Sequence, residues 1–522
     1  MPARTPAPNP PTPTPGTPTS STPAQVRHGA VTVVVCIALA AVVSAMASLN
    51  VALPGIARAT QASQTQLAWV IDAYSLVFAA LLLPAGAIGD RFGRRRALLI
   101  GLTIFGIGSG LAMTANSAGE LIALRGMLGV GAALVMPSTL STITSTFPPE
   151  QRARAVGVWT GVAGGSAVLG LLTTGLLLEA FSWQSVFALN IILAAVAIVG
   201  TLRIVPESAD EQAPSLDLGG AVLVVVGLVA LVYSVIEAPT VGWGSGRTVI
   251  GLVVGMAVIV GFVAWELRQD HPMLDPRVFQ HRGLAAGSLS ILVQFFAFFG
   301  FIFVILQYLQ GVRGDSTLIA AVSMLPLTGG LLPAARLSPV LAARFGPRRV
   351  CVTGLILVAA ALTVLSRLQG DSPYWLMLCG LIPLGAGMGA AMTPATSAIT
   401  EALPAAQQGV GSALNDLSRE VGGALGIAVI GSILTASYRS HLELPGAPAA
   451  VVDQARNSFA VAAHLGGPVA SQAQAAFVSG MHAALLGAAV AALGAALAVA
   501  GLLPQRRPAT TSTARSSSSS VL

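Results

Sequence analysis

The sequence of 522 residues is 54% hydrophobic and only 9% charged, whereas soluble domains have about 25% charged residues. This composition excludes an ordinary soluble protein and indicates an integral membrane protein. All 27 basic residues are arginine, so there is no lysine for a nucleotide-binding P-loop or a Schiff base. The net charge of +7 lies mostly in short loops between apolar runs, where it sets membrane topology rather than binding nucleic acid.

The two ends of the chain are low in complexity. Residues 1–29 are dominated by Pro, Thr, Ser and Ala, and residues 506–522 are rich in Ser. Such segments bury too little apolar surface to fold, so we predict a disordered tail at each end. The first tail has neither the charge order nor the apolar core of a signal peptide.

Between the tails, apolar runs of about 20 residues alternate with short polar breaks, and each run can cross the roughly 30 Å of bilayer hydrocarbon. We predict fourteen spans, near 31–53, 67–88, 97–116, 120–146, 153–177, 183–203, 217–237, 248–267, 284–310, 317–342, 350–368, 374–400, 408–435 and 479–503. An even number places both termini on one side of the membrane. Because arginines are more frequent in the connections on the side of residue 90, we predict that both termini are cytoplasmic.

A short charged turn, Gly86 to Arg96, joins the second and third spans. Its glycines let the two helices approach closely and turn tightly, and Asp90 can cap a helix or pair with a cation. A weaker copy, Ala343 to Arg349, joins the tenth and eleventh spans. Because eight spans rather than six separate the two turns, two spans have been inserted between two related halves.

The predicted organisation is therefore a six-helix N-terminal half at 30–205, two inserted helices at 206–280 and a six-helix C-terminal half at 281–505. The longest external connection runs from Tyr438 to Gln474. Its middle is compatible with a helix on the membrane surface.

The charged turn resembles the G-x-x-x-D-R-x-G-R-R signature of the major facilitator superfamily. The stretches Leu49 to Pro54 and Trp69 to Tyr74, together with fourteen spans, are similar to the fourteen-span drug:proton antiporter branch of that superfamily. The resemblance covers about residues 30–505. It implies an all-α integral membrane protein with the major facilitator fold, in which two six-helix halves flank two inserted helices.

Six residues of the turn are candidates for a conformational latch that locks one arrangement of the two halves. They are Gly86, Gly89, Asp90, Arg91, Gly93 and Arg94. A topology anchor alone explains the arginines but leaves the glycines and the aspartate without a reason. We therefore expect Asp90 and Arg91 to act as the latch.

Arg125, in the fourth span, matches the membrane-embedded arginine of this branch, and the resemblance implies a part in proton transfer. A buried arginine costs at least ~2.5 kcal/mol in hydrocarbon, so it should face a partner or a wet cavity. The fifth span keeps Gly170 and Gly175 of the branch's signature but lacks its proline. We expect the two glycines to allow close helix packing. Without the proline, this span lacks the residue that would kink it.

Members of the superfamily often carry an acidic residue five positions before the residue that matches Asn50, but here this position is Ala45. The acid that carries protons must therefore lie elsewhere in this chain. Burial favours the protonated form of an acid and a nearby arginine favours the ionised form, so an acid that alternates between the two environments can load and release a proton. Asp72, near the outer end of the second span, is the candidate external proton site, with Arg125 as a possible counter-charge.

The thirteenth span supplies Asp416 and Glu420, which are four residues apart and share one helix face. Arg419 is near enough to offset one of these charges. We expect the acids to recognise a cationic substrate; the alternative is a helix end among the cytoplasmic headgroups. Asn50 and Tyr74, from the two stretches that carry the resemblance, are further candidates for the cavity.

These features predict a bacterial cytoplasmic-membrane exporter of small apolar or cationic drugs, driven by protons and working by alternating access. A proton-coupled or facilitated transporter of a metabolite or nutrient is the alternative in the same class. The absence of H-E-x-x-H and G-x-S-x-G argues against an enzyme, and the short tails argue against a sensor. The expected partners are a small-molecule substrate, protons and membrane lipids, without cofactor, metal or nucleic acid. We expect a monomer.

Overall fold

The computed structural model describes residues 28–503 except 61–63, 210–216, 271, 273, 405–406, 445–447, 458 and 465. Apart from positions 28 and 29, which are helical, the two predicted tails lie outside the described residues. Every regular element in the described part of the chain is a helix.

The N-terminal bundle consists of α1 (His28–Thr60), α2 (Gln64–Phe92), α3 (Arg94–Ala112), α4 (Ala118–Thr146), α5 (Pro149–Ala180) and α6 (Ser185–Ile204). A hairpin of α7 (Leu218–Val241) and α8 (Gly246–Glu266) follows, and then the short helix η1 (Pro276–Gln280). The C-terminal bundle consists of α9 (Arg282–Gln307), η2 (Tyr308–Val312), α10 (Thr317–Ser323), α11 (Leu325–Phe345), α12 (Pro347–Leu365), α13 (Tyr374–Glu401), α14 (Gln408–His441), α15 (Ala449–Asn457), α16 (Phe459–His464) and α17 (Gly467–Leu502).

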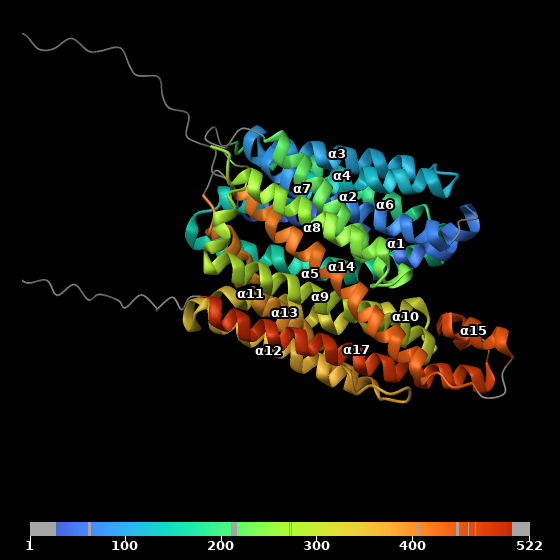
Figure 1. Ribbon diagram of the computed structural model, residues 1–522. Helices are drawn as coiled ribbons and strands as arrows, with labels where there is room; N and C mark the ends of the chain where they lie inside the picture. The colour runs from blue at the N-terminus through green and yellow to red at the C-terminus, as the bar shows by residue number, and fades with distance from the viewer. Residues whose placement is uncertain are drawn as a thin grey trace, which may run out of the picture.

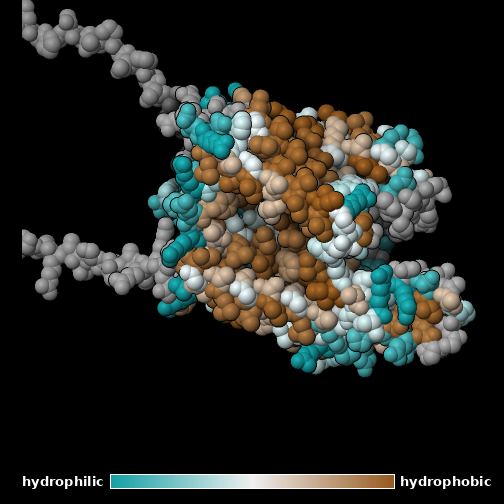
Figure 2. Space-filling model, in the orientation of Figure 1, coloured by the Kyte–Doolittle hydropathy of each residue, from teal (hydrophilic) through white to brown (hydrophobic). Residues whose placement is uncertain are grey.

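Fourteen helical segments of the described residues are long and apolar enough to cross a membrane, which confirms the predicted number of spans. Two of them are composite, because η2 continues α9 and α10 continues into α11. Figure 2 shows the corresponding surface, a broad hydrophobic band with hydrophilic residues gathered toward both ends. A band of this kind suits the hydrocarbon of a bilayer, with the polar ends at the headgroups.

Short polar side chains cap the N-termini of several of these helices. The Ser117 hydroxyl accepts a hydrogen bond from the Glu120 N–H at 3.2 Å, which caps α4. Asp217 accepts from the Gly220 N–H at 3.0 Å and caps α7, and Ser245 caps α8 in the same way. Each cap satisfies a backbone donor that has no partner inside its helix.

The last connection differs in length from the expectation. α14 continues to His441 and α17 begins at Gly467 rather than near 479, because polar residues early in α17 hide its helix from a search for apolar runs. The middle of the connection is helical as expected, in α15 and α16. The Phe459 ring of α16 stacks on Phe477 of α17 with centroids 4.1 Å apart, which fastens this segment to the C-terminal bundle.

Figure 1 shows the two bundles side by side, with α7 and α8 lying across the N-terminal one. The bundles meet where α2 and α4 contact α14, and where α5 contacts α10, α11 and α13. α7 contacts both α2 and α14, so the hairpin lies along the seam between the bundles. The surface is notched between the bundles on the right of Figure 2. The residue boundaries of the halves and of the inserted segment stay a prediction.

Candidate glycines of α5 differ in how tightly they are packed. A Cβ on Gly170 would lie 2.8 Å from the Cα of Ser44 in α1, so only glycine permits this helix crossing. A Cβ on Gly175 would meet Leu318 at 3.6 Å, an ordinary contact. α5 runs from Pro149 to Ala180 as one helix without the proline of the branch signature.

Candidate functional site

The Asp90 carboxylate joins the two bundles at one end of the molecule. Asp90 lies near the end of α2 with 2% of its surface exposed. Its oxygens accept hydrogen bonds from the Gly409 N–H at 2.7 and 2.8 Å and from the Val410 N–H at 3.1 Å. Because these donors belong to the first turn of α14, the carboxylate sits at the positive end of a helix dipole of the opposite bundle.

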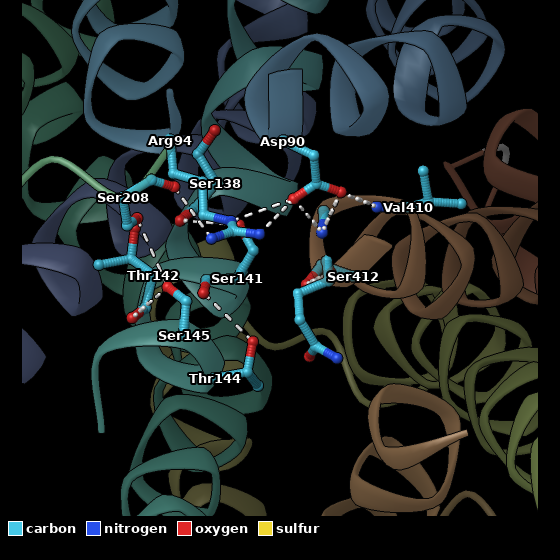
Figure 3. A network of polar contacts seen from close by, with 12 residues as sticks. Asp90, Arg94, Ser138, Ser141, Thr142, Thr144, Ser145, Ser208, Val410 and Ser412 are labelled. Atoms are coloured by element: carbon cyan, nitrogen blue, oxygen red, sulfur yellow. Dashed lines mark hydrogen bonds and ion pairs between the residues drawn. The ribbon is translucent and has the colours of Figure 1, made fainter. Parts of the chain in front are cut away.

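Arg94, the first residue of α3, neutralises that carboxylate. Its Nη2 lies 2.6 Å and its Nε 3.1 Å from Asp90 Oδ1, and its side chain is 4% exposed. The remaining Nη1 donates to the Ser208 carbonyl at 2.9 Å. Figure 3 shows Arg94 between Asp90 and Ser208, with Val410 on the far side of Asp90. A buried charge paired in this way, and bonded to backbone as well, avoids the cost of an isolated ion.

The glycines of the turn have different roles in this contact. A Cβ on Gly86 would lie 2.5 Å from the Gly409 carbonyl oxygen, so α2 and α14 touch through their backbones. Gly93 has a φ of 111°, a conformation that favours glycine. A Cβ on Gly89 would lie 3.6 Å from the Ser138 hydroxyl, an ordinary contact, so a small side chain fits at this position.

The cation paired with Asp90 is Arg94. The Arg91 side chain is exposed at the end of α2, whereas Gly93 turns the chain so that Arg94 points back to the carboxylate. Of the candidate latch residues, Arg94 therefore supplies the cation that pairs with Asp90. The role of these residues as a latch stays a prediction.

Glu207, in the connection after α6, also belongs to this site and was missed in the sequence. Its Oε1 accepts from the Arg95 N–H at 3.2 Å, and its Oε2 lies 3.7 Å from Arg96 Nε. A Cβ on Gly93 would come within 2.5 Å of Oε1. Glu207 thus caps the start of α3. In the sequence, the one indication of such an acid was that the turn contains more arginines than acidic residues.

A second group of polar residues connects α2 with α4. Arg125 is 1% exposed, donates from Nε to the Val70 carbonyl at 2.9 Å, and has Cζ 4.4 Å from the centroid of the Tyr74 ring. Its Nη2 has no hydrogen-bond partner among the described residues. Half-buried Asp72, two residues after Val70, interacts electrostatically with Arg125. The arginine expected to need a partner therefore has an aromatic face, a carbonyl and a nearby acid.

A third group lies on α14. Asp416 and Arg419 are 1% and 4% exposed at their side chains, and Arg419 Nη1 lies 3.5 Å from Asp416 Oδ1. Asn415 donates to the same Asp416 oxygen at 3.2 Å. Glu420, the next residue along α14, is half-buried. Asp416 and Arg419 are buried within the protein in the third and fourth turns of α14, and the alternative of a helix end at the depth of the headgroups stays open.

The hairpin contributes a further acid that the sequence did not single out. Half-buried Glu237 of α7 interacts electrostatically with Asp72. The Trp69 ring stacks on Tyr233 of α7 with centroids 5.6 Å apart, which holds the two helices together close by. Asn50 lies in α1, and its side chain is outside the described part of the structure. The described residues contain no group of His, Cys, Asp and Glu arranged for a metal ion.

Comparison with known proteins gives consistent results. The family model described as Major Facilitator Superfamily matches residues 34–427. The chain is 36% identical to the multidrug efflux pump LfrA of Mycolicibacterium smegmatis, over 83% of this chain and 88% of the relative. It is 35% identical to the methyl viologen resistance protein SmvA of Salmonella typhimurium, with the same coverage. The structure of the proton:xylose symporter XylE aligns with a TM-score of 0.60 at 15% identity, covering 92% of this chain and 96% of the symporter.

Proposed function

The chain belongs to the major facilitator superfamily, and we propose that it exports small apolar or cationic molecules from the cytoplasm in exchange for protons. It is a multi-pass membrane transporter rather than an enzyme, related to drug and antibiotic resistance proteins. The substrate, the drive and the direction are the proposed part. We also propose that both termini are cytoplasmic, because arginines are concentrated in the connections at the Asp90 end.

The observation that carries the proposal is the position of ionisable groups on both sides of the seam. Asp72 and Arg125 belong to the N-terminal bundle, while Asp416 and Glu420 belong to the C-terminal bundle. Across the seam, the Cζ of Arg419 lies 5.3 Å from the centroid of the Trp159 ring. Charged groups at this depth are costly unless they serve a function. Groups that face one another across two moving bundles change surroundings when the bundles rock, which couples protonation to movement.

Asp72 is the proposed proton site. It lies a few residues into its span from the end opposite Asp90, which the topology places outside, where incoming protons arrive. Arg125 supplies a positive charge that competes with the proton for this acid. A neutral Asp72 and an ionised Asp72 attract Arg125 differently, so protonation changes the contacts between α2 and α4.

Asp416 and Glu420 are the proposed recognition site for cationic substrates. A buried carboxylate attracts a desolvated cation more strongly than a surface carboxylate does. One relative is named for multidrug efflux and another for resistance to methyl viologen, which is an organic cation. The Asp90–Gly409 contact is the proposed latch of the arrangement that is closed on the cytoplasmic side.

Transport by purified protein in lipid vesicles tests the proposal. We expect an imposed pH gradient to drive ethidium movement in exchange for protons, and Asp72→Asn to abolish the exchange while ethidium binding remains measurable. Exposed Asp270→Asn is the matched control and should retain exchange. Ethidium movement that ignores the pH gradient would indicate a facilitator, and full proton exchange by Asp72→Asn would place the coupling site elsewhere.

A further inference from the structure

The guanidinium of Arg419 lies against two aromatic rings and a carboxylate. Its Cζ is 4.5 Å from the centroid of the Phe295 ring and 5.3 Å from that of the Trp159 ring. Its Nη1 is 3.5 Å from Asp416 Oδ1. Aromatic faces and a carboxylate are the groups that bind a flat organic cation. We call these three residues, Trp159, Phe295 and Asp416, the cation cage.

The cage is built from both bundles, and each of its rings is held in place within its own bundle. Trp159 belongs to α5 of the N-terminal bundle, is fully buried, and donates from its Nε1 to the Thr139 hydroxyl of α4 at 3.0 Å. Phe295 belongs to α9 and packs against the rings of Phe298 and Phe299. Since each ring is held by neighbours of its own bundle, the cage exists independently of the arginine that occupies it.

The occupant is incompletely paired. Asp416 Oδ2 and Arg419 Nη1 have no hydrogen-bond partner among the described residues, although both are buried. The shortest approach between the two groups, 3.5 Å, exceeds the usual length of a charge-assisted hydrogen bond of about 2.8 Å. A buried ion pair with poor geometry does not recover the cost of removing its charges from water. A cation that fills the cage better than Arg419 therefore has free energy to gain.

We propose that Arg419 is a tethered substitute for the substrate, and that a planar, delocalised organic cation displaces its guanidinium from the cage. The inference rests on the proposed function and specifies its substrate class. The guanidinium is itself planar and delocalised, so it reports the shape and charge that the cage accepts. It also keeps the buried carboxylate paired when no substrate is present, which avoids an uncompensated charge within the membrane.

A different role for Arg419 would be to bind an anionic group of the substrate. The surroundings oppose it, because the negative faces of two rings and a carboxylate surround the guanidinium. An anion at this place would be repelled by every group of the cage. Anionic ligands therefore serve as the contrasting probe.

The test is ethidium binding to the purified full-length protein in detergent, followed by fluorescence. Arg419→Gln keeps a planar polar group but removes the charge, and we expect it to tighten ethidium binding roughly three- to tenfold, the range that one cation–π partner is worth. Arg419→Lys leaves a charge that fits the cage less well, so its binding should be tightened to a smaller extent. Exposed Arg439→Gln on the same helix is the control and should bind like the wild type.

Substituting residues of the cage in the Arg419→Gln background shows which of them produce the tighter ethidium binding. Trp159→Leu should cancel the gain, because one ring face is lost while an apolar side chain remains. Weaker ethidium binding in both Arg419 variants, or tighter binding of an anionic dye such as fluorescein, would overturn the inference. A wild-type protein that binds ethidium but shows no proton exchange in vesicles defeats the proposed function alone, since the binding measurement needs no gradient.

Discussion

At the scale of single residues, Asp90 carries the contact that joins the bundles. It accepts three backbone and side-chain partners from two helices, and its pairing with Arg94 is almost fully buried. Removing one partner of a buried ion pair costs about 3–5 kcal/mol, since the other charge stays uncompensated. A loss of this size is enough to shift the population of a transporter away from the closed arrangement.

Asp90→Asn is therefore expected to leave membrane insertion intact while it reduces dye efflux by at least tenfold. The amide keeps the size of the carboxylate, but it cannot neutralise Arg94 or accept from Gly409 with two oxygens. Efflux from cells, normalised to the amount of protein in the membrane, measures the effect, with Asp270→Asn as control. Undiminished efflux would reduce Asp90 to a part of the topology signal.

The two glycines of the turn offer a matched pair of variants. Gly86→Ala places a Cβ within 2.5 Å of the Gly409 carbonyl oxygen, which forces α2 and α14 apart at the latch. Gly89→Ala introduces the same methyl group where neighbours are 3.6 Å away. We expect the first variant to lose most of its efflux and the second to retain it. Equal losses would mean that glycine in this turn serves helix flexibility instead of close approach.

At the scale of elements, the connection after α6 holds the latch turn in position. Glu207 accepts a hydrogen bond from the Arg95 N–H at the start of α3, while Ser208 accepts from Arg94 through its carbonyl. Both residues precede the inserted hairpin. The hairpin in turn contacts α2 through Trp69 and Tyr233, and contacts α14 through the Trp243 N–H donated to Ser432 at 2.8 Å. The inserted element therefore touches both bundles.

Variants of Glu207 distinguish its role as a hydrogen-bond acceptor from its role as a negative charge. Its side chain is one-third exposed, so its ion pair with Arg96 contributes little, about 0–1 kcal/mol. The cap of α3 needs only an acceptor. We expect Glu207→Gln to export dye like the wild type and Glu207→Ala to export two- to fivefold more slowly, roughly the effect of losing one cap. Equal impairment in both variants would show that the negative charge is what matters.

At the scale of the whole molecule, the chain is two bundles with ionisable groups along their seam. We expect export to need neither ATP nor a sodium gradient, because the chain has no lysine for a P-loop and no nucleotide-binding motif. A proton ionophore should stop dye export from cells, while ATP depletion at a maintained proton gradient should not. Export that survives the ionophore and stops on ATP depletion would contradict the proposed drive.

The sequence by itself determined the number of spans and the position of the latch turn, because membrane crossing depends on the local length of apolar runs and on arginines close by. It also singled out Asp72, Arg125, Asp416 and Glu420, since a charge within an apolar run stands out without any structure, and their roles stay predictions. Some helix ends were misplaced: α1 runs to Thr60 rather than to 53, and polar residues extend the helices at both ends of the C-terminal connection.

Tertiary structure alone decided which groups meet. Asp90 pairs with a backbone N–H 319 residues away, and Trp159 reaches Arg419 from the other bundle. No local pattern encodes such contacts, because an apolar span shows similar residues on the faces that meet lipid and on those that meet another helix. The pairing of Arg94 with Asp90 likewise depends on the backbone turn at Gly93. These contacts come from the packing of the helices, which depends on all of them at once and cannot be read from the separate spans.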